Sequence, residues 1–207
     1  MFLTASSLIV STLLGIAPAP PQTPGLESKS VPKLTDDGKA TDAITHKRLV
    51  SMIGPKLEKS DGSTIATKSF LAGKKYVLLY FSAGWCPPCR MFTPELVTFA
   101  KSNEKADDFA VILVGADRSA DAQRKYMEKY KMEFPAVPLD QAVKVKRAYA
   151  GGGIPNLVVL DAEDSPIKGS YETKGRYTPK NRSSYIGPQP VLKAFQTMRK
   201  MPESTDG

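Results

Sequence analysis

The two cysteines of this chain, Cys86 and Cys89, are separated by two residues, both of them prolines. A Cys-x-x-Cys pair at the start of a helix can close and open a disulfide, so it is suited to thiol–disulfide exchange. The apolar run at residues 76–81 predicts a buried strand before the pair, and residues 91–101 predict a helix after it. We therefore expect the cysteines at a strand-to-helix turn.

This placement would give the two sulfurs different roles. Cys86 would lie at the N-cap, where unpaired backbone N–H groups and the positive end of the helix dipole favour an anion. Cys89 would lie one turn further along and more buried, as suits the thiol that resolves a mixed disulfide. Pro87 and Pro88 fit a first helical turn but have no N–H to donate. We therefore predict only a moderate lowering of the Cys86 pKa, to ~7.

Two other uses of the pair are a structural disulfide and a metal site. Trp85 before the pair and two prolines within it are unusual for core filling. A zinc site needs about four ligands, and the chain offers two cysteines and a distant His46. We expect no metal, although a site shared between two copies stays open. His46, beside Lys47 and Arg48, is expected to be a solvated surface residue.

Residues 81–96, FSAGWCPPCRMFTPEL, resemble the active-site segment of the thioredoxin superfamily. The Cys-Pro-Pro-Cys-Arg form followed by Phe-Thr-Pro is most similar to the tryparedoxin and nucleoredoxin branch. Residues 153–156 (Gly-Ile-Pro-Asn), with the apolar run after them, resemble the family's cis-proline loop. The resemblance covers roughly residues 57–200. It implies an α/β thioredoxin fold: a mixed central sheet flanked by helices, with an N-terminal β-hairpin extension.

The resemblance also assigns roles to individual residues. It implies catalytic Cys86 and Cys89; substrate-binding Trp85, Pro87, Pro88, Ile154 and Pro155; and supporting Tyr80, Arg90 and Pro94, the last matching a proline that kinks the family's active-site helix. The backbone of Ile154 would pair with an extended substrate segment. The three glycines at 151–153 would let this loop approach the cysteines closely.

The sequence departs from thioredoxin itself at one buried charge pair. Tyr80 stands where thioredoxin has a buried acid, and Leu113 aligns with the lysine that partners it. The absence of both charges together is physically reasonable, because one buried ion without its partner would be costly. A Tyr80 hydroxyl relay, or water, would then have to serve in place of the acid. Asp117 is the nearest candidate carboxylate, and its alternative role is to cap the following helix.

The chain of 207 residues, 41% hydrophobic and with a net charge of +8, is long enough for one domain with a sizeable core. We divide it into a signal peptide (1–19), a linker and N-terminal extension (20–55), a thioredoxin-like domain (56–201) and a disordered tail (202–207). The signal peptide is indicated by an uncharged start and a short apolar run ending at Ala-Pro-Ala, too short to span a membrane. It predicts a periplasmic or secreted protein, with a cytoplasmic one as the alternative.

Further along, Asp61-Gly62 predicts a hairpin over residues 57–67, and Asp140 is expected to cap a helix ending at Tyr149. The segment 174–185 carries four basic side chains and is expected to be a solvated loop, not a nucleic-acid contact. Its basic residues are Lys174, Arg176, Lys180 and Arg182.

The sequence therefore predicts a thiol–disulfide oxidoreductase that reduces or isomerises protein disulfides, without a metal or organic cofactor. Its expected partners are disulfide-containing proteins and an upstream reductase or membrane thiol carrier, with no nucleic acid and no stable membrane insertion. The alternative is a peptide-binding or chaperone-like module in which the disulfide is structural. A peroxidase is a third class, but Thr93 and Arg90 do not match the arginine and threonine that would activate peroxide.

Overall fold

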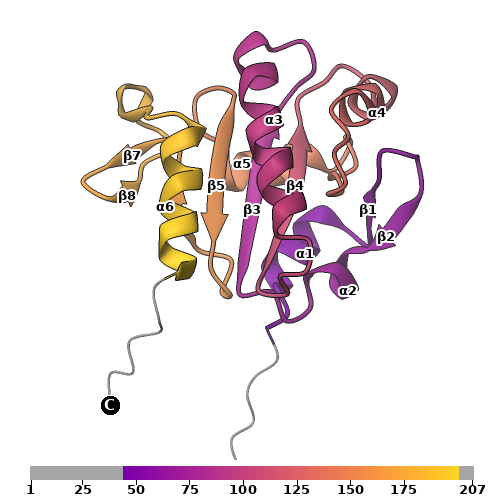
Figure 1. Ribbon diagram of the computed structural model, residues 1–207, viewed down its shortest axis with the longest axis horizontal. Helices are drawn as coiled ribbons and strands as arrows, with labels where there is room; N and C mark the ends of the chain where they lie inside the picture. The colour runs from indigo at the N-terminus through magenta and orange to yellow at the C-terminus, as the bar shows by residue number, and fades with distance from the viewer. Residues whose placement is uncertain (1–43, 201–207) are drawn as a thin grey trace, which may run out of the picture. The chain divides into compact units, whose positions relative to one another are not determined.

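A four-stranded mixed sheet lies at the centre of the structure, a computed structural model that describes residues 44–200 (Figure 1). The strands lie in the order β4 (Phe109–Gly115), β3 (Tyr76–Ser82), β5 (Asn156–Leu160) and β6 (Pro166–Gly169). β3 pairs in parallel with β4, whereas β3–β5 and β5–β6 are antiparallel. β3 is apolar on both faces because it is an interior strand with packed layers on either side.

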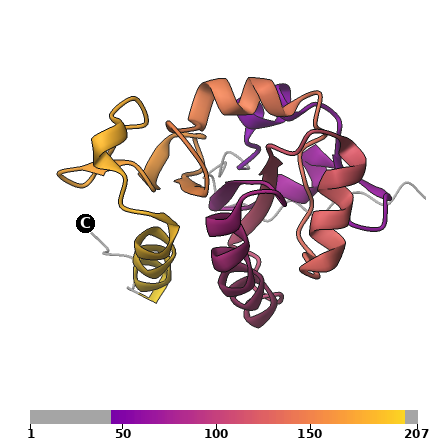
Figure 2. The ribbon, with the colours of Figure 1, turned by 90° about the horizontal axis from the view of Figure 1, so that it is seen from above.

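The side chains of the sheet alternate between two hydrophobic clusters, one on each face. On β3, Leu78 and Tyr80 join the first cluster, whereas Val77 and Leu79 join the second. The first is covered by α3 (Pro87–Ser102), α4 (Ala120–Lys129) and α6 (Pro188–Lys200), and the second by α1 (Lys47–Ile53) and α5 (Ala142–Tyr149). Seen from above, α3 and α6 lie on one side of the sheet and α5 on the other (Figure 2). Tyr80 therefore faces the helix that begins beside the cysteines.

The predicted α/β fold, a mixed sheet flanked by helices, is confirmed. The predicted hairpin is formed by β1 (Lys56–Glu58) and β2 (Thr64–Ala66), and Gly62 in its turn has a φ of 83°. A short helix, α2 (Thr67–Leu71), follows it. The expected Asp140 cap is wrong, because α5 has Gln141 at its N-cap and no side-chain capping bond.

The basic segment 174–185 packs against the rest of the domain, although its charge indicated a solvated loop. It contributes to a small ribbon, β7 (Glu172–Thr173) and β8 (Arg176–Tyr177), and a 3-10 turn, η1 (Arg182–Ser184). The hydroxyl of Tyr177 donates to the backbone carbonyl of Tyr149, and that of Tyr185 donates to the Pro155 carbonyl over 2.8 Å. Tyr177 therefore holds this segment against the end of α5, and Tyr185 holds it against Pro155.

His46 is buried, and the expectation of a solvated residue was wrong. It is 1% exposed; Nδ1 lies 2.6 Å from Asp164 Oδ1, and Nε2 lies 2.7 Å from the Lys74 carbonyl oxygen. A carboxylate and a carbonyl only accept hydrogen bonds, so both ring nitrogens carry a proton when both bonds form. Burial alone would lower the pKa of His46, but the bonds to Asp164 and Lys74 outweigh it and raise the pKa.

Asp164 also ties α1 to the turn between β5 and β6. Its Oδ2 accepts the Leu49 N–H over 2.9 Å, and Leu49 and Ile53 are fully buried in the second cluster. α1 falls within the segment expected to be an N-terminal extension. It nevertheless packs into the same core as the sheet.

The signal peptide predicted at 1–19, the linker as far as residue 43 and the tail predicted at 202–207 lie outside the described residues. Between residues 44 and 200, no helix is both long enough and apolar enough to cross a membrane.

We predict that His46→Ala lowers the free energy of unfolding by about 3 kcal/mol, because it leaves the Asp164 carboxylate buried without its partner. The contribution of His46 protonation to stability should be fully present below about pH 6.5, the unfolded pKa, and be lost as the pH rises through the raised folded pKa. Urea denaturation across this range measures it. Lys47→Ala, at an exposed neighbouring position, is the control. Equal pH dependence in the parent and His46→Ala proteins would contradict the assignment.

Candidate active site

Cys86 and Cys89 form a disulfide at the N-terminus of α3, with their Cα atoms 5.2 Å apart. Cys86 is the N-cap residue, and its sulfur accepts the Cys89 N–H over 3.3 Å. Pro87 and Pro88 occupy the first positions of the helix, as the sequence predicted, so neither contributes an N–H to this sulfur. The N-cap placement of Cys86 is confirmed.

The two cysteines differ in exposure in the expected direction. Cys86 keeps 4% of its surface exposed and Cys89 keeps none. Trp85, directly before them, is 58% exposed. Among residues 44–200, Cys86 is therefore the cysteine of the pair that an approaching molecule can reach.

The loop before β5 lies against the exposed sulfur. The Ile154–Pro155 peptide bond is cis, as predicted, and the Ile154 carbonyl oxygen is 3.9 Å from Cys86 Sγ. Pro155 is buried, whereas Ile154 is partly exposed and packs against the cysteine pair. The two segments that the sequence suggested would form one site are therefore in contact.

Close packing requires the first glycine of this loop. A Cβ atom at Gly151 would overlap the ring of Tyr171, which is buried beside β6. A side chain at this position would have to displace either the ring or the loop. The glycines were expected to let the loop approach the cysteines, but the groups that a Cβ atom at these glycines would meet are Tyr171 and Arg182.

Trp85 is held by the loop that follows β4. Its Nε1–H donates to the Ala116 carbonyl over 3.0 Å, and the N–H of Gly84 donates to Asp117 Oδ1 over 3.0 Å. The alternative role of Asp117 as a helix cap is wrong, because Ser119 caps α4 by accepting the Ala122 N–H. Asp117 instead anchors the residue before Trp85.

The side chain of Tyr80 supports the buried cysteine by binding the backbone of Cys89. It is fully buried on β3, and its hydroxyl donates to the Cys89 carbonyl over 3.1 Å. Burial raises the pKa of Tyr80 far above its ordinary value, so the phenol stays protonated at neutral pH. Leu113 lies opposite Tyr80 in the sheet register. Both positions of thioredoxin's charge pair are thus uncharged here and lie side by side, and Tyr80 holds a carbonyl rather than acting as a base.

Three further hydroxyls complete a buried cluster that sequence reasoning did not assign to the site. Thr93 Oγ1 donates to the Cys89 carbonyl over 2.8 Å and lies 2.9 Å from the Tyr80 hydroxyl. The Tyr126 hydroxyl contacts both Thr93 and Ser82. Thr93 could have been found from its position one helical turn after Cys89. The ring of Tyr126 packs in the first hydrophobic cluster, and its hydroxyl joins the polar cluster.

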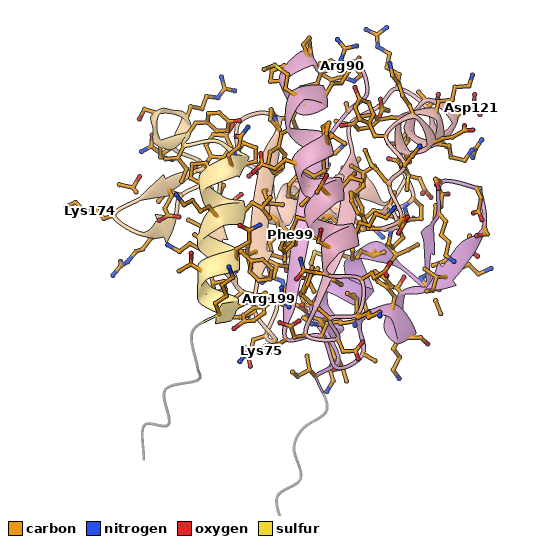
Figure 3. All side chains as sticks on the ribbon, viewed as in Figure 1. Lys75, Arg90, Phe99, Asp121, Lys174 and Arg199 are labelled. Atoms are coloured by element: carbon orange, nitrogen blue, oxygen red, sulfur yellow. A yellow bond between two sulfur atoms is a disulfide. The ribbon has the colours of Figure 1, made fainter. Side chains whose placement is uncertain are left out.

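The remaining predicted residues, Pro87, Pro88, Arg90 and Pro94, all belong to α3. Pro87, Pro88 and Arg90 are exposed at the start of α3. Arg90 is labelled at this end of the helix in Figure 3, far from Arg199. Pro94 lies inside α3, where it has no N–H to donate to the carbonyl one turn earlier.

Asp117 is the ionisable group that contacts the turn before the cysteines. Burial raises its pKa, opposed by the Gly84 N–H and the charge of Lys146. Burial also lowers the pKa of Lys146, opposed by Asp117. Asp117 Oδ2 is buried without a hydrogen-bond partner among the described residues. In the same part of the chain, no group of three or more His, Cys, Asp or Glu side chains could hold a metal ion.

Comparisons with known proteins agree with this geometry. A family model described as thioredoxin-like matches residues 73–165. Tryparedoxin from Trypanosoma brucei brucei is 37% identical over 99 residues, which cover 46% of this chain and 67% of that protein. Thioredoxin from Wuchereria bancrofti has a TM-score of 0.53 at 30% identity, covering 71% of this chain and 97% of that one. Tryparedoxin II from C. fasciculata has a TM-score of 0.51 at 33% identity, covering 59% and 82%.

Nucleoredoxins match over a smaller part of their length. The protein from Bos taurus is 39% identical over 147 residues, which cover 67% of this chain but 32% of that protein. The Xenopus laevis protein is covered over 23% of its length. The chain belongs to the thioredoxin superfamily, and within it to the branch that holds the tryparedoxins and nucleoredoxins. This membership supports a thiol–disulfide redox function.

We predict that Tyr80→Phe lowers the free energy of unfolding by about 1–2 kcal/mol, because the ring still packs but a buried hydroxyl cluster loses one member. Urea denaturation of the oxidised protein measures the change. Tyr76→Phe, on the same strand but only partly buried, should change stability by less than about 0.5 kcal/mol. Equal effects of the two substitutions would show that the hydroxyl cluster adds nothing.

Proposed function

We propose that this protein is a protein-disulfide reductase whose Cys86 and Cys89 pass two electrons to a disulfide of another protein. The observation that carries the proposal is the Cys86–Cys89 disulfide at the start of α3, with the Cys86 sulfur 3.9 Å from the Ile154 carbonyl oxygen. This is the oxidised end state of such a reaction. The difference in exposure between the two cysteines supports an order for its steps.

Cys86 acts first, because it is the cysteine that a substrate can reach. Its thiolate attacks one sulfur of the substrate disulfide and forms a mixed disulfide, and the other substrate sulfur leaves as a thiolate that takes a proton from solvent. The Cys89 N–H that points at Cys86 Sγ stabilises the thiolate before the attack. The predicted Cys86 pKa of ~7 stays a prediction.

Cys89 then resolves the mixed disulfide. Its thiol loses a proton and attacks Cys86 Sγ, the Cys86–Cys89 bond forms, and the second substrate sulfur leaves and is protonated. The hydroxyls of Tyr80 and Thr93 fix the Cys89 carbonyl, and hence the backbone from which this sulfur attacks. The protein ends oxidised and the substrate reduced by two electrons.

Substrate binding is assigned to the surface around Cys86. Trp85 offers an exposed apolar face on one side of the sulfur, and Ile154 with the cis Pro155 forms the other side. An extended substrate segment would pair with the backbone of Ile154. Renewed reduction needs two electrons from a partner, an upstream reductase or a membrane thiol carrier, in a periplasmic, secreted or cytoplasmic setting.

The proposal predicts different failures for the two cysteine variants in insulin reduction with dithiothreitol. Cys86→Ser should fall to the uncatalysed rate, because no nucleophile remains at the exposed position. Cys89→Ser should also lose turnover, and when it is first reduced, freed of dithiothreitol and then mixed with insulin, it should accumulate a mixed disulfide with an insulin chain, visible on a non-reducing gel. A Cys86→Ser protein as fast as the parent would contradict the proposal and favour a binding module with a structural disulfide.

A further inference from the structure

Basic side chains line the hollow beside Trp85. Arg90, Arg118 and Lys129 are exposed there, and none of the three has a carboxylate within 4 Å among residues 44–200. The carboxylate of this hollow is Asp117, which is only partly exposed and already accepts the Gly84 N–H. One side of the approach to Cys86 is therefore positively charged.

The hollow on the other side of the sulfur is also basic. It is lined by Ile154 and the glycines before it, together with Lys146 and Arg147. Lys146 faces Asp117, but Arg147 is exposed and unpaired within the described part of the chain. A Cβ atom at Gly152 would lie 2.8 Å from Arg182 Cγ, so the Arg182 side chain lies directly over the loop.

Part of the positive charge at the opposite end of the sheet is neutralised by carboxylates. Arg199 makes two hydrogen bonds to Asp108, and Lys74 pairs with Asp107. Lys101 and Lys105 are exposed at the same end and have no ion pair among residues 44–200. Figure 3 labels Arg90 at the end of α3 that holds the cysteines, and Arg199 at the opposite end. Around Cys86, cations without a carboxylate partner lie on two sides of the point that a substrate must approach.

We infer that this basic surface selects disulfides lying in acidic segments of protein substrates. The inference rests on the proposed reductase function and names its substrate class. Charges within about 8–10 Å of a bound segment interact with its charges, because this is the distance over which salt screens electrostatic interactions. Same-sign charges around a reactive group raise the encounter rate with oppositely charged partners and repel like-charged ones. A protein is favoured over a nucleic acid because the sulfur between the two hollows needs a disulfide to react with.

Two quenched peptides that share one central disulfide test the inference, one with glutamates flanking the cysteines and the other with lysines. At low ionic strength the parent protein should reduce the glutamate peptide with a kcat/KM about tenfold higher. Added salt should bring the ratio towards one, because screening weakens both attraction and repulsion.

Charge reversal on both sides of Cys86 supplies the second measurement. The Arg118→Glu/Arg147→Glu protein should lose or invert the preference, while both peptides remain substrates. The control is Lys101→Glu/Lys105→Glu, which changes net charge equally at exposed positions. Lys101, like Arg147, lies in the last turn of its helix, about 20 Å from Cys86 along α3. This protein should keep the parent preference.

The outcomes of these experiments distinguish failure of the acidic-substrate inference from failure of the proposed reductase function. Equal reduction of both peptides by the parent, or equal loss of preference in the control, would overturn the acidic-substrate inference and leave the reductase standing. Reduction of neither peptide would overturn both. Tighter binding of a mixed-sequence single-stranded oligonucleotide than of the glutamate peptide would assign the surface to nucleic acid and also overturn the inference.

Discussion

The contact between Cys86 Sγ and the first turn of α3 organises this structure, because every other part of the site is placed relative to it. The sulfur accepts the Cys89 N–H, which fixes it at the mouth of the helix with its partner one turn behind. The sheet register then brings two loops to the same point. Phe81 pairs with Asn156, which sets the cis Pro155 beside the end of β3, and Ser82 pairs with Gly115, which sets Asp117 beside the Gly84 turn.

The support beneath the cysteines is made of hydroxyls and not of charges. Tyr80 and Thr93 share the Cys89 carbonyl as their acceptor, and Tyr126 links Thr93 to Ser82. With Leu113 beside Tyr80, a buried charge here would have no partner at that position and would be costly. A neutral cluster avoids this cost and still holds the helix start in place. The ionisable group near the site is Asp117, which lies outside this cluster and accepts the Gly84 N–H in the turn before Trp85.

Local patterns in the sequence predicted much of this arrangement. The N-cap role of Cys86, the first-turn prolines and the hairpin around Gly62 depend on neighbouring residues, and the cis Pro155 follows from a motif that the family shares. Contacts between distant residues were not predicted. His46 meets Asp164 across 118 positions, and Tyr185 reaches the Pro155 carbonyl from a segment that its charge indicated to be solvated. Nothing near either residue in sequence signals these partners, because only the packed sheet brings them together.

Selective labelling of the reduced protein tests the central claim most directly. One sulfur, that of Cys86, is accessible at the N-terminus of α3, and its partner Cys89 is buried one turn further along. Limited alkylation with iodoacetamide at neutral pH, followed by mass spectrometry of the peptides, should place the first label on Cys86 and leave Cys89 unmodified. Equal labelling of both cysteines, or a first label on Cys89, would contradict the account.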